Sequence, residues 1–236
     1  MSAAILAEQY GASAGAQISL DGMVAYYRGE EAAGADALDA HTGGLTLAAL
    51  NAPGSAAGKV GNCRTFSGEA GDQAFSSANA AFRLTGSLML VCWVRLTTKL
   101  DHMHLLSRCD GLGLDDGYGL RYDANADRFG FFTASGGVVY PVSAGPVPLL
   151  NTWYFVIGWY DAGTGKNYCQ VDNGAEGEAA GAAPTVAANP FTWGGLNESF
   201  YNVDGAMDEA AVVARVWTPG ERAAWFNNNT GRTYPT

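Results

Sequence analysis

The sequence predicts an all-β protein, an antiparallel β-sandwich that ends in one short helix. Glycine accounts for 32 of the 236 residues and charged residues for only 15%, a balance typical of turn-rich β-structure. Residues 206–217 are apolar on both faces of a predicted strand, as expected inside a sheet that is packed on two sides. Thr218 and Glu221 flank Pro219 as a capping box, so a helix should begin at Pro219 and continue to about Asn228.

The apolar strand and the helix form one continuous C-terminal unit. With regular alternation, the strand places Met207, Ala211 and Val213 on one face and Ala210 and Val212 on the other. The residues expected to face inward on the helix are Ala223, Ala224 and either Trp225 or Phe226. Gly231 is the expected stop signal, because glycine readily adopts the left-handed conformation that ends a helix.

The middle of the chain alternates short apolar segments with turn residues. Residues 118–122 and 128–132 lie on either side of a short loop, so we expect them to pair as a hairpin. Residues 138–140 predict one more strand. Asn173–Gly174 is a suitable two-residue turn, because both residues tolerate positive φ. The Ala/Gly-rich segment 175–189 is expected to be a loop.

Length and composition indicate one domain with a substantial core, since 48% of the residues are hydrophobic. The formal net charge of −10 argues against nucleic acid as a partner, because phosphate binding needs clusters of Lys and Arg. We predict no membrane span, because the sequence contains no run of about 18 apolar residues.

Residues 1–20 are rich in Ala, Gly and Ser and are expected to form an arm against the body or an attachment segment. They have no basic start and contain Glu8, so we predict no signal peptide and folding in the cytoplasm. The alternative is an extracellular mature form whose signal has been removed. We expect free thiols at the four cysteines, Cys63, Cys92, Cys109 and Cys169, with Cys92 and Cys169 in the core.

The C-terminal unit also carries a family resemblance. The run GAMDEAAVVARVWTPGERAAWFNN resembles the closing signature of laminin-G-like, concanavalin A-like jelly-roll domains. Met207–Glu209 matches the "IDE" core of that signature, and 218–221 matches its "SPEE". The resemblance implies that the predicted sandwich is an antiparallel jelly roll of this kind.

Four further segments extend the resemblance over about residues 21–231. They are an opening strand at 22–27, a "GKFGN"-like run at 58–68, a strand at 87–96 with Trp93 at the family tryptophan, and an "LNTWYHV"-like run at 149–161. Residues 191–195 stand where the family has "LTIGG", and 167–174 where it has "LYVNG". The predicted organisation is thus an N-terminal arm, 1–20, followed by a laminin-G-like domain, 21–236.

The resemblance implies a structural calcium site. In many relatives the opening loop and the "DE" strand meet around a calcium ion, which implies Asp39, Thr42 and Asp208 as the ligands here. Oxygen ligands of this type suit calcium. The alternative is a carboxylate that accepts hydrogen bonds from loop amides without a metal.

No catalytic constellation is predicted. The paired glutamates around an aspartate that related sandwich glycosidases carry on one strand are absent, so we expect no enzyme. His102-Met103-His104 is interpreted as a polar loop, because three histidines without a cysteine pair are too few for a transition-metal site. Exposed aromatic rings can stack on sugars. The residues expected to bind glycan in this way are Trp193, Tyr201 and Tyr118, with burial in the core as the alternative.

The function expected from the resemblance is a non-enzymatic structural or binding module. By analogy we expect a bacteriophage virion surface protein, a head-decoration or tail component, that attaches to other virion proteins through 1–20 and adheres to cell-surface glycans. A homo-oligomer fits such a role. The competing hypothesis is a soluble, calcium-dependent carbohydrate-binding lectin domain.

Overall fold

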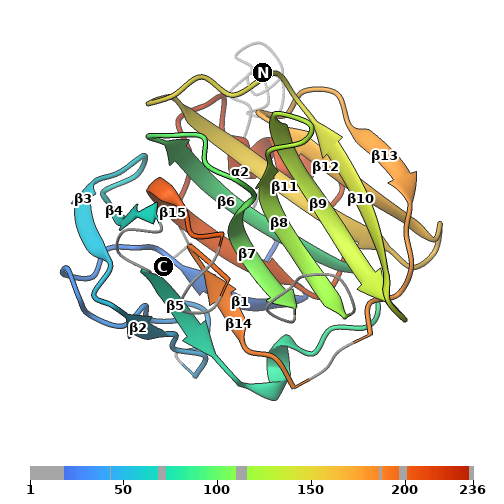
Figure 1. The fold of residues 1–236 in the computed structure, drawn as a ribbon, viewed down its shortest axis with the longest axis horizontal. Coiled ribbons are helices and arrows are strands. Elements are labelled where there is room, and N and C mark those ends of the chain that lie inside the picture. The colour runs from blue at the N-terminus through green and yellow to red at the C-terminus, as the bar shows by residue number, and fades with distance from the viewer. Residues whose placement is uncertain are drawn as a thin grey trace, which may run out of the picture.

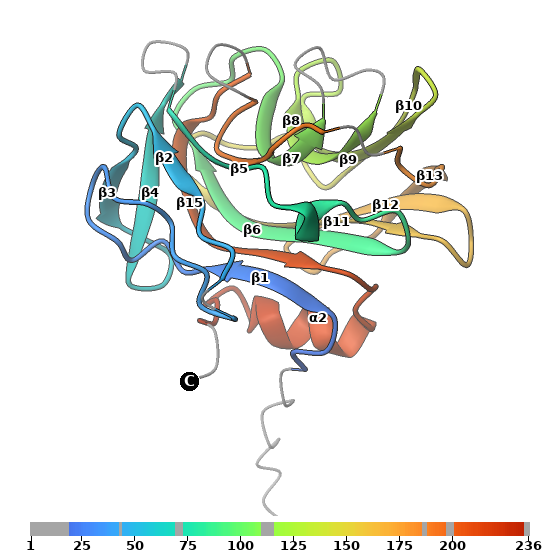
Figure 2. The same ribbon diagram turned by 90° about the horizontal axis from the view of Figure 1, so that it is seen from below.

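The computed structural model describes residues 19–42, 44–68, 73–109, 116–185, 188–196 and 201–233. These residues form two antiparallel β-sheets that stack face to face, with one α-helix on the outside (Figures 1 and 2). The predicted all-β sandwich with a short C-terminal helix is therefore confirmed.

One sheet, which we call the back sheet, has the predicted C-terminal strand in its middle. Its strands follow in the order β13 (Gly177–Ala180), β12 (Lys166–Val171), β11 (Trp153–Asp161), β6 (Leu88–Leu96), β15 (Asp204–Val213), β4 (Asn62–Ser67) and β3 (Gly54–Ala57). The first described strand, β1 (Met23–Tyr27), also pairs with β15.

The other sheet, which we call the front sheet, lies nearer the viewer in Figure 1. Its strands follow in the order β10 (Val138–Ala144), β9 (Arg128–Ser135), β8 (Gly117–Asp123), β7 (Met103–Cys109), β14 (Phe191–Trp193), β5 (Ala74–Ser77) and β2 (Ala48–Leu50). A short 3₁₀ turn, Ala80–Phe82, follows β5. The β8–β9 pairing is the predicted hairpin.

The main core lies between the sheets, because alternate residues of each strand point inward. The inward residues of β6 and β8 show this alternation: they are Leu88, Leu90, Cys92 and Val94, and Tyr118, Leu120 and Tyr122. A second apolar cluster covers the outer face of the back sheet and includes Met89, Val91, Trp93, Phe155, Ile157 and Trp159. The back sheet is therefore apolar on both faces, as the sequence predicts for its central strand.

Helix α2 (Pro219–Phe226) covers this second cluster from outside (Figure 2). Arg222, Ala224 and Trp225 are its buried residues, and Phe226 is partly buried and also packs against the cluster. Ala223, which was expected to face inward, is only partly buried. The Trp225 ring stacks on Trp217, with centroids 5.3 Å apart. The helix ends at Asn227 (φ 49°) and not at Gly231, because asparagine tolerates the left-handed conformation of the cap.

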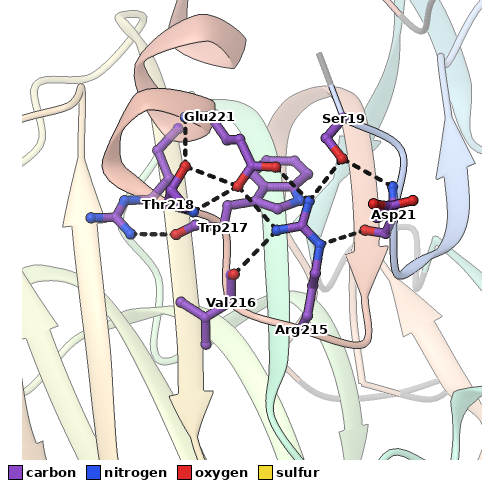
Figure 3. Close-up of polar contacts among 8 residues, drawn as sticks. Ser19, Asp21, Arg215, Val216, Trp217, Thr218 and Glu221 are labelled. Atoms are coloured by element: carbon purple, nitrogen blue, oxygen red, sulfur yellow. Dashed lines mark hydrogen bonds and ion pairs between the residues drawn. The ribbon is translucent and has the colours of Figure 1, made fainter. Parts of the chain in front are cut away.

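The start of α2 is fixed by a polar network (Figure 3). Thr218 Oγ1 accepts from the Glu221 backbone N–H at 3.3 Å, and Glu221 Oε2 accepts from the Thr218 N–H at 2.7 Å, which confirms the predicted capping box. Arg215 pairs with Glu221 Oε1 at 2.5 Å and donates from Nε to the Asp21 carbonyl at 2.7 Å. It also donates to Ser19 Oγ at 3.2 Å, so the network ties the helix to the beginning of the described chain.

A bulge interrupts β15. Its register against β6 shifts between Asp208 and Ala211, and Glu209 has a φ of 48°. Met207 and Ala210 both point into the main core, so the two residues between them both face outward. The prediction that Met207 shares a face with Ala211 is therefore wrong, because it assumed unbroken alternation.

Other differences concern short elements. β13 lies inside the segment 175–189, which was expected to be a loop, because the edge of β12 supplies pairing partners to these small residues. The left-handed residues of the preceding turn are Asp172 (φ 51°) and Asn173 (φ 55°), one position earlier than predicted. His104 belongs to β7 and is buried, so the polar loop expected at 102–104 is also wrong.

The four cysteines are buried thiols that form no disulfide, and Cys92 and Cys169 lie in the main core as predicted. Residues 1–18 of the predicted N-terminal arm lie outside the described residues. None of the helices in the described ranges is long and apolar enough to cross a membrane.

Candidate functional site

Polar and aromatic side chains gather on the outer side of the front sheet, where β7 begins and β8 ends. Leu120 and Tyr122 point into the main core, so Arg121 between them points outward. The β7–β8 register places His104 opposite Arg121, and the His104 N–H donates to the Tyr201 carbonyl at 2.8 Å. We call this group the Tyr201 cluster, and its members are His102, His104, Arg121, Asp123, Asn125 and Tyr201.

The polar half of the cluster is organised by the Asp123 carboxylate. Its Oδ2 accepts from Arg121 Nη2 at 2.7 Å, and its Oδ1 accepts from the backbone N–H groups of Asn125 (3.0 Å) and Ala126 (3.3 Å). His102 lies beside it, with Nδ1 3.6 Å from Asp123 Oδ1 and Nε2 3.3 Å from Asn125 Nδ2. The contacts of Asp123 with Arg121, Asn125 and Ala126 are local, so the loop between β8 and β9 holds its polar groups in place before any ligand arrives.

The aromatic half consists of Tyr201 and the rings below it. The Tyr201 ring stacks on buried His104, with centroids 5.6 Å apart and planes inclined by 23°. It also meets the edge of His102 at 6.0 Å. Tyr201 itself remains partly exposed and packs against a small apolar cluster, Cys109, Phe132 and Leu196.

Both histidines of the cluster are neutral at pH 7. Burial, together with the nearby Arg121 charge, lowers the pKa of His104 to about 3. Burial also lowers the pKa of His102, helped by Arg121 and opposed by Asp123. His102 Nδ1 accepts from the Ala124 N–H at 3.3 Å and Nε2 lies beside the Asn125 amide, so the neutral His102 ring helps to hold the loop in place.

The cluster has the chemistry of a sugar-binding surface. A partly exposed phenol ring offers an apolar face, and the amide of Asn125 and the guanidinium group of Arg121 beside it offer hydrogen-bonding groups. Asn125 is exposed, His102 and Arg121 are half-buried, and Asp123 is buried beneath them. The exposed groups could contact a ligand while Asp123 holds them in position.

Of the three aromatic residues expected to bind glycan, the structure leaves one accessible. Trp193 and Tyr118 are both 0% exposed. Trp193 packs at 5.1 Å from Phe75 in the main core, and the Tyr118 hydroxyl donates to the Phe82 carbonyl at 2.6 Å. Neither ring presents a face to a sugar, because both point inward from the front sheet. Tyr201 alone of the three is partly exposed.

The predicted calcium ligands fall into two groups. Asp39 and Thr42 lie together: Asp39 Oδ2 accepts from Thr42 Oγ1 at 2.7 Å and from the Thr42 N–H at 3.2 Å. Asp39 Oδ1 accepts from the N–H groups of Tyr26 at 3.1 Å and His41 at 2.9 Å. Both Asp39 oxygens therefore have protein donors, the arrangement expected without a metal.

Asp208 lies on the bulge of β15 with different partners. Its Oδ2 accepts from the N–H groups of Lys59 (2.8 Å) and Val60 (2.9 Å), while its buried Oδ1 has no hydrogen-bond partner in the described part of the chain. The neighbouring Glu209 Oε2 accepts from the Tyr26 hydroxyl. The bulge thus places two consecutive carboxyl groups under the outer layer of the molecule.

Both of these carboxyl groups are held towards the neutral form. Burial raises the pKa of Asp208 to about 7 and that of Glu209 to about 8, and the charge of Asp208 adds to the second shift. The described residues contain no group of three or more His, Cys, Asp or Glu side chains that could hold a metal. With one free oxygen, from Asp208, the shared calcium site stays a prediction.

Sequence reasoning missed most of the Tyr201 cluster. His102–His104 and Asp123–Asp127 stand out as motifs, but they are about 20 positions apart and each alone suggests only a loop. The pairing of β7 with β8 brings them together, and no local pattern specifies that register.

Comparison with known proteins gives the family. Residues 68–221 match a laminin-G family described as the concanavalin A-like lectin/glucanases superfamily. No curated protein matches the chain.

Solved structures share the fold at low sequence identity. A Trypanosoma rangeli sialidase in complex with the inhibitor DANA superposes with a TM-score of 0.63 and 18% identity, over 92% of this chain and 35% of the sialidase. The binding domain of Paraclostridial Mosquitocidal Protein 1 gives a TM-score of 0.67 and 10% identity, over 88% of this chain and 52% of that chain. The botulinum neurotoxin serotype G binding domain gives a TM-score of 0.63 and 9% identity, over 87% of this chain and 51% of that chain. The chain thus spans about a third to a half of these proteins, and the likeness shows the fold alone.

Proposed function

The chain belongs to the concanavalin A-like lectin/glucanases superfamily, and we propose that it is a non-enzymatic binding module that holds a glycan at the Tyr201 cluster. The observation that carries this proposal is the partly exposed Tyr201 ring beside a pre-formed group of hydrogen-bonding side chains. Stacking on an aromatic ring and hydrogen bonding to fixed polar groups are the two interactions that a sugar ring requires.

The proposed role is binding without turnover. Within the Tyr201 cluster the one carboxylate, Asp123, already accepts from Arg121, Asn125 and Ala126. Glycoside hydrolysis usually needs two carboxyl groups on opposite sides of the bond that is cut, and the cluster offers one.

A glycan array on the purified full-length chain tests the proposal. We expect selective binding to a subset of glycans, lost in Tyr201→Ala and kept in Tyr201→Phe, because stacking needs the ring and not the hydroxyl group. An array without binding by the wild-type chain, or equal binding by Tyr201→Ala, would contradict the site. Incubation of bound glycans followed by mass spectrometry should show no cleavage products.

The biological setting that we propose is the surface of a bacteriophage virion, as a head-decoration or tail component. Support comes from the predicted attachment segment 1–20, whose described end is fixed to the body, since Arg215 donates to Ser19 Oγ and pairs with Glu221 of α2. Removal of residues 1–18 keeps Ser19 and should leave the sandwich folded but abolish incorporation into virions. Normal incorporation of the truncated chain would refute this role and leave glycan binding intact.

A soluble calcium-dependent lectin is the second candidate, favoured by the buried Asp208 Oδ1 that lacks a hydrogen-bond partner in the described residues. Its test is the same array in calcium and in chelator. Binding that disappears in chelator and in Asp208→Asn would select this candidate. Binding that is unchanged by chelator would leave the metal-independent module.

A further inference from the structure

The outer face of the back sheet carries two cations over two indole rings, beyond the end of α2. The Arg95 guanidinium carbon lies 5.1 Å from the centroid of the Trp153 ring, and Lys59 Nζ lies 4.3 Å from the Trp93 ring. Trp93 belongs to the outer apolar cluster, so Arg95, two residues further along β6, projects from the same face. The Cα atoms of two such positions are about 7 Å apart, so the two cation–ring pairs occupy neighbouring positions on one face of β6.

The strand register explains why the rings and the cations meet. In the β6–β11 pair, Trp93 lies opposite Phe155 and Arg95 lies opposite Trp153. Phe226, at the end of α2, covers the first pair, with its ring 6.0 Å from both Trp93 and Phe155. The second pair is partly exposed.

These two cations differ from the five in the described chain that form ion pairs with carboxylates. Five Lys and Arg residues form ion pairs there: Lys99 with Asp127, Arg121 with Asp123, Lys166 with Glu178, Arg215 with Glu221 and Arg222 with Glu176. Across the same described ranges, Arg95 makes no hydrogen bond and no ion pair. Lys59 Nζ donates to a neutral amide oxygen, Asn229 Oδ1, at 3.1 Å.

Two carboxyl groups lie near Lys59, and both are engaged by backbone amides. Asp172 Oδ1 accepts from the Phe155 N–H at 2.8 Å. Asp208 Oδ2 accepts from the N–H groups of Lys59 and Val60. Burial raises the pKa of each carboxyl group and so favours its neutral form. Burial lowers the pKa of Lys59 and the Asp172 charge opposes that shift, so Lys59 is compensated in part, whereas Arg95 forms no ion pair in the described chain.

We propose that Arg95, Lys59 and Trp153 form a binding site for an acidic saccharide, meaning a sugar ring that carries a carboxylate or sulfate group. A guanidinium group with free N–H donors binds such an anion through two parallel hydrogen bonds. The ammonium group adds charge, and the edge of the indole offers apolar contact to the ring that carries the anion.

The chemistry of the site favours a small anionic group over a polyanion. The chain carries a net charge of −10, which repels an extended polyanion such as nucleic acid, and the site supplies two cations. One carboxylate or sulfate group is small enough to be bound by these two cations. The site lies on the back sheet, so it is separate from the Tyr201 cluster and goes beyond the function proposed for that cluster.

Isothermal titration of the full chain at low salt tests the proposal with three probes: tetragalacturonate, a κ-carrageenan tetrasaccharide whose acidic groups are all sulfates, and neutral maltotetraose. We expect binding of at least one acidic probe, no competition from maltotetraose, and weaker binding at high salt because the contact is electrostatic. The two acidic arms distinguish a carboxylate from a sulfate ligand. Failure of both acidic probes to bind overturns the proposal.

Variants locate the binding. Arg95→Gln should weaken the acidic probe about tenfold, the expected effect of losing a charge-assisted contact, and Lys59→Gln should weaken it less. Arg95→Lys should recover part of the loss, because it restores the charge without the planar donors. Lys166→Gln is the matched control, since it removes one charge elsewhere on the back sheet, where Lys166 pairs with Glu178 at 2.8 Å.

Two outcomes would assign the binding elsewhere. An equal loss in Arg95→Gln and Lys166→Gln would indicate non-specific attraction to any cation. A loss in Tyr201→Ala would move the acidic saccharide to the Tyr201 cluster. Arg95 is half-buried and has no hydrogen-bond partner in the described chain, so Arg95→Gln should keep the wild-type melting temperature.

Discussion

The outer faces of the two sheets both bury ionisable side chains. The back sheet buries carboxylic acids and the front sheet buries histidines, and different structures cover the two faces. On the back sheet, Asp208 and Glu209 lie under the outer layer and have raised pKa values. On the front sheet, His102 and His104 have lowered pKa values. In both places burial favours the neutral form, because a charge loses its hydration there.

The covers differ in what they leave accessible. The apolar cluster of the back sheet is closed by a helix, with Trp225 packed inward and Phe226 over its edge. In the Tyr201 cluster, His104 is covered by the ring of Tyr201, which is itself partly exposed. A helical cover serves stability, whereas a single exposed ring beside polar groups is also a surface that can bind. The comparison therefore separates residues whose loss unfolds the protein from residues whose loss removes a ligand.

The largest effect is expected at the helical cover. Trp225→Ala should reduce the free energy of unfolding by about 3–5 kcal/mol, because it leaves a cavity between α2 and the back sheet. Denaturant unfolding measures this loss. Leu149→Ala is the control, since Leu149 is 66% exposed and its truncation should cost less than about 0.5 kcal/mol. Equal losses in the two variants would show that the helix does not seal that face.

The next effect is the pH dependence of stability that Asp208 and Glu209 cause. Denaturant unfolding at a series of pH values, with a chelator present to remove metal ions, measures it. Folded-state pKa values of about 7 and 8 exceed the usual values of 3.8 and 4.5, so the folded state binds more protons than the unfolded state between them. The contribution is fully present below the unfolded-state values, near pH 4, and is lost as the pH rises through 7 and 8. Asp208→Asn should flatten this decline, and an unchanged decline would assign it to other groups.

The histidines should give the opposite slope. His104 has a folded pKa of about 3 against the usual 6.5, so the unfolded state takes up a proton first as the pH falls. Stability should therefore fall from pH 6.5 towards pH 4, by about 1–2 kcal/mol at pH 5. Thermal melts of the wild type and His104→Gln at pH 5 and 7 measure this loss of stability. The melting temperature of the variant should fall less between pH 7 and pH 5 than that of the wild type.

The smallest effect is expected at the start of the helix. The hydrogen bond from the Arg215 guanidinium lowers the pKa of the Glu221 carboxyl group to about 2, although burial acts in the opposite direction. Glu221→Gln should cost about 1 kcal/mol, because the amide keeps part of the capping box and loses the ion pair. Thr218→Ala is the companion variant, and chemical denaturation compares them. A loss as large as that of Trp225→Ala would mean that the network in Figure 3, and not apolar packing, holds the cover in place.

The sequence by itself determined the elements whose signals are local. Apolar residues on both faces of 206–217 predicted a central strand, and Thr218 with Glu221 predicted the first turn of α2. These signals survive because periodicity and capping depend on residues within one or two turns of each other. Together with the family resemblance they were sufficient for the all-β sandwich and its C-terminal helix.

Only the tertiary structure decided the sites. The bulge of β15 turned Glu209 outward beside Asp208, and an extra residue in a strand leaves no mark on the apolar pattern. The β7–β8 register joined His104 to Arg121, and the same pairing turned Tyr118 into the core, although Tyr118 and Tyr201 look equally suitable for glycan binding in the sequence. Shifting a strand by one residue exchanges its two faces, so which aromatic side chain meets solvent depends on contacts between residues far apart in the chain.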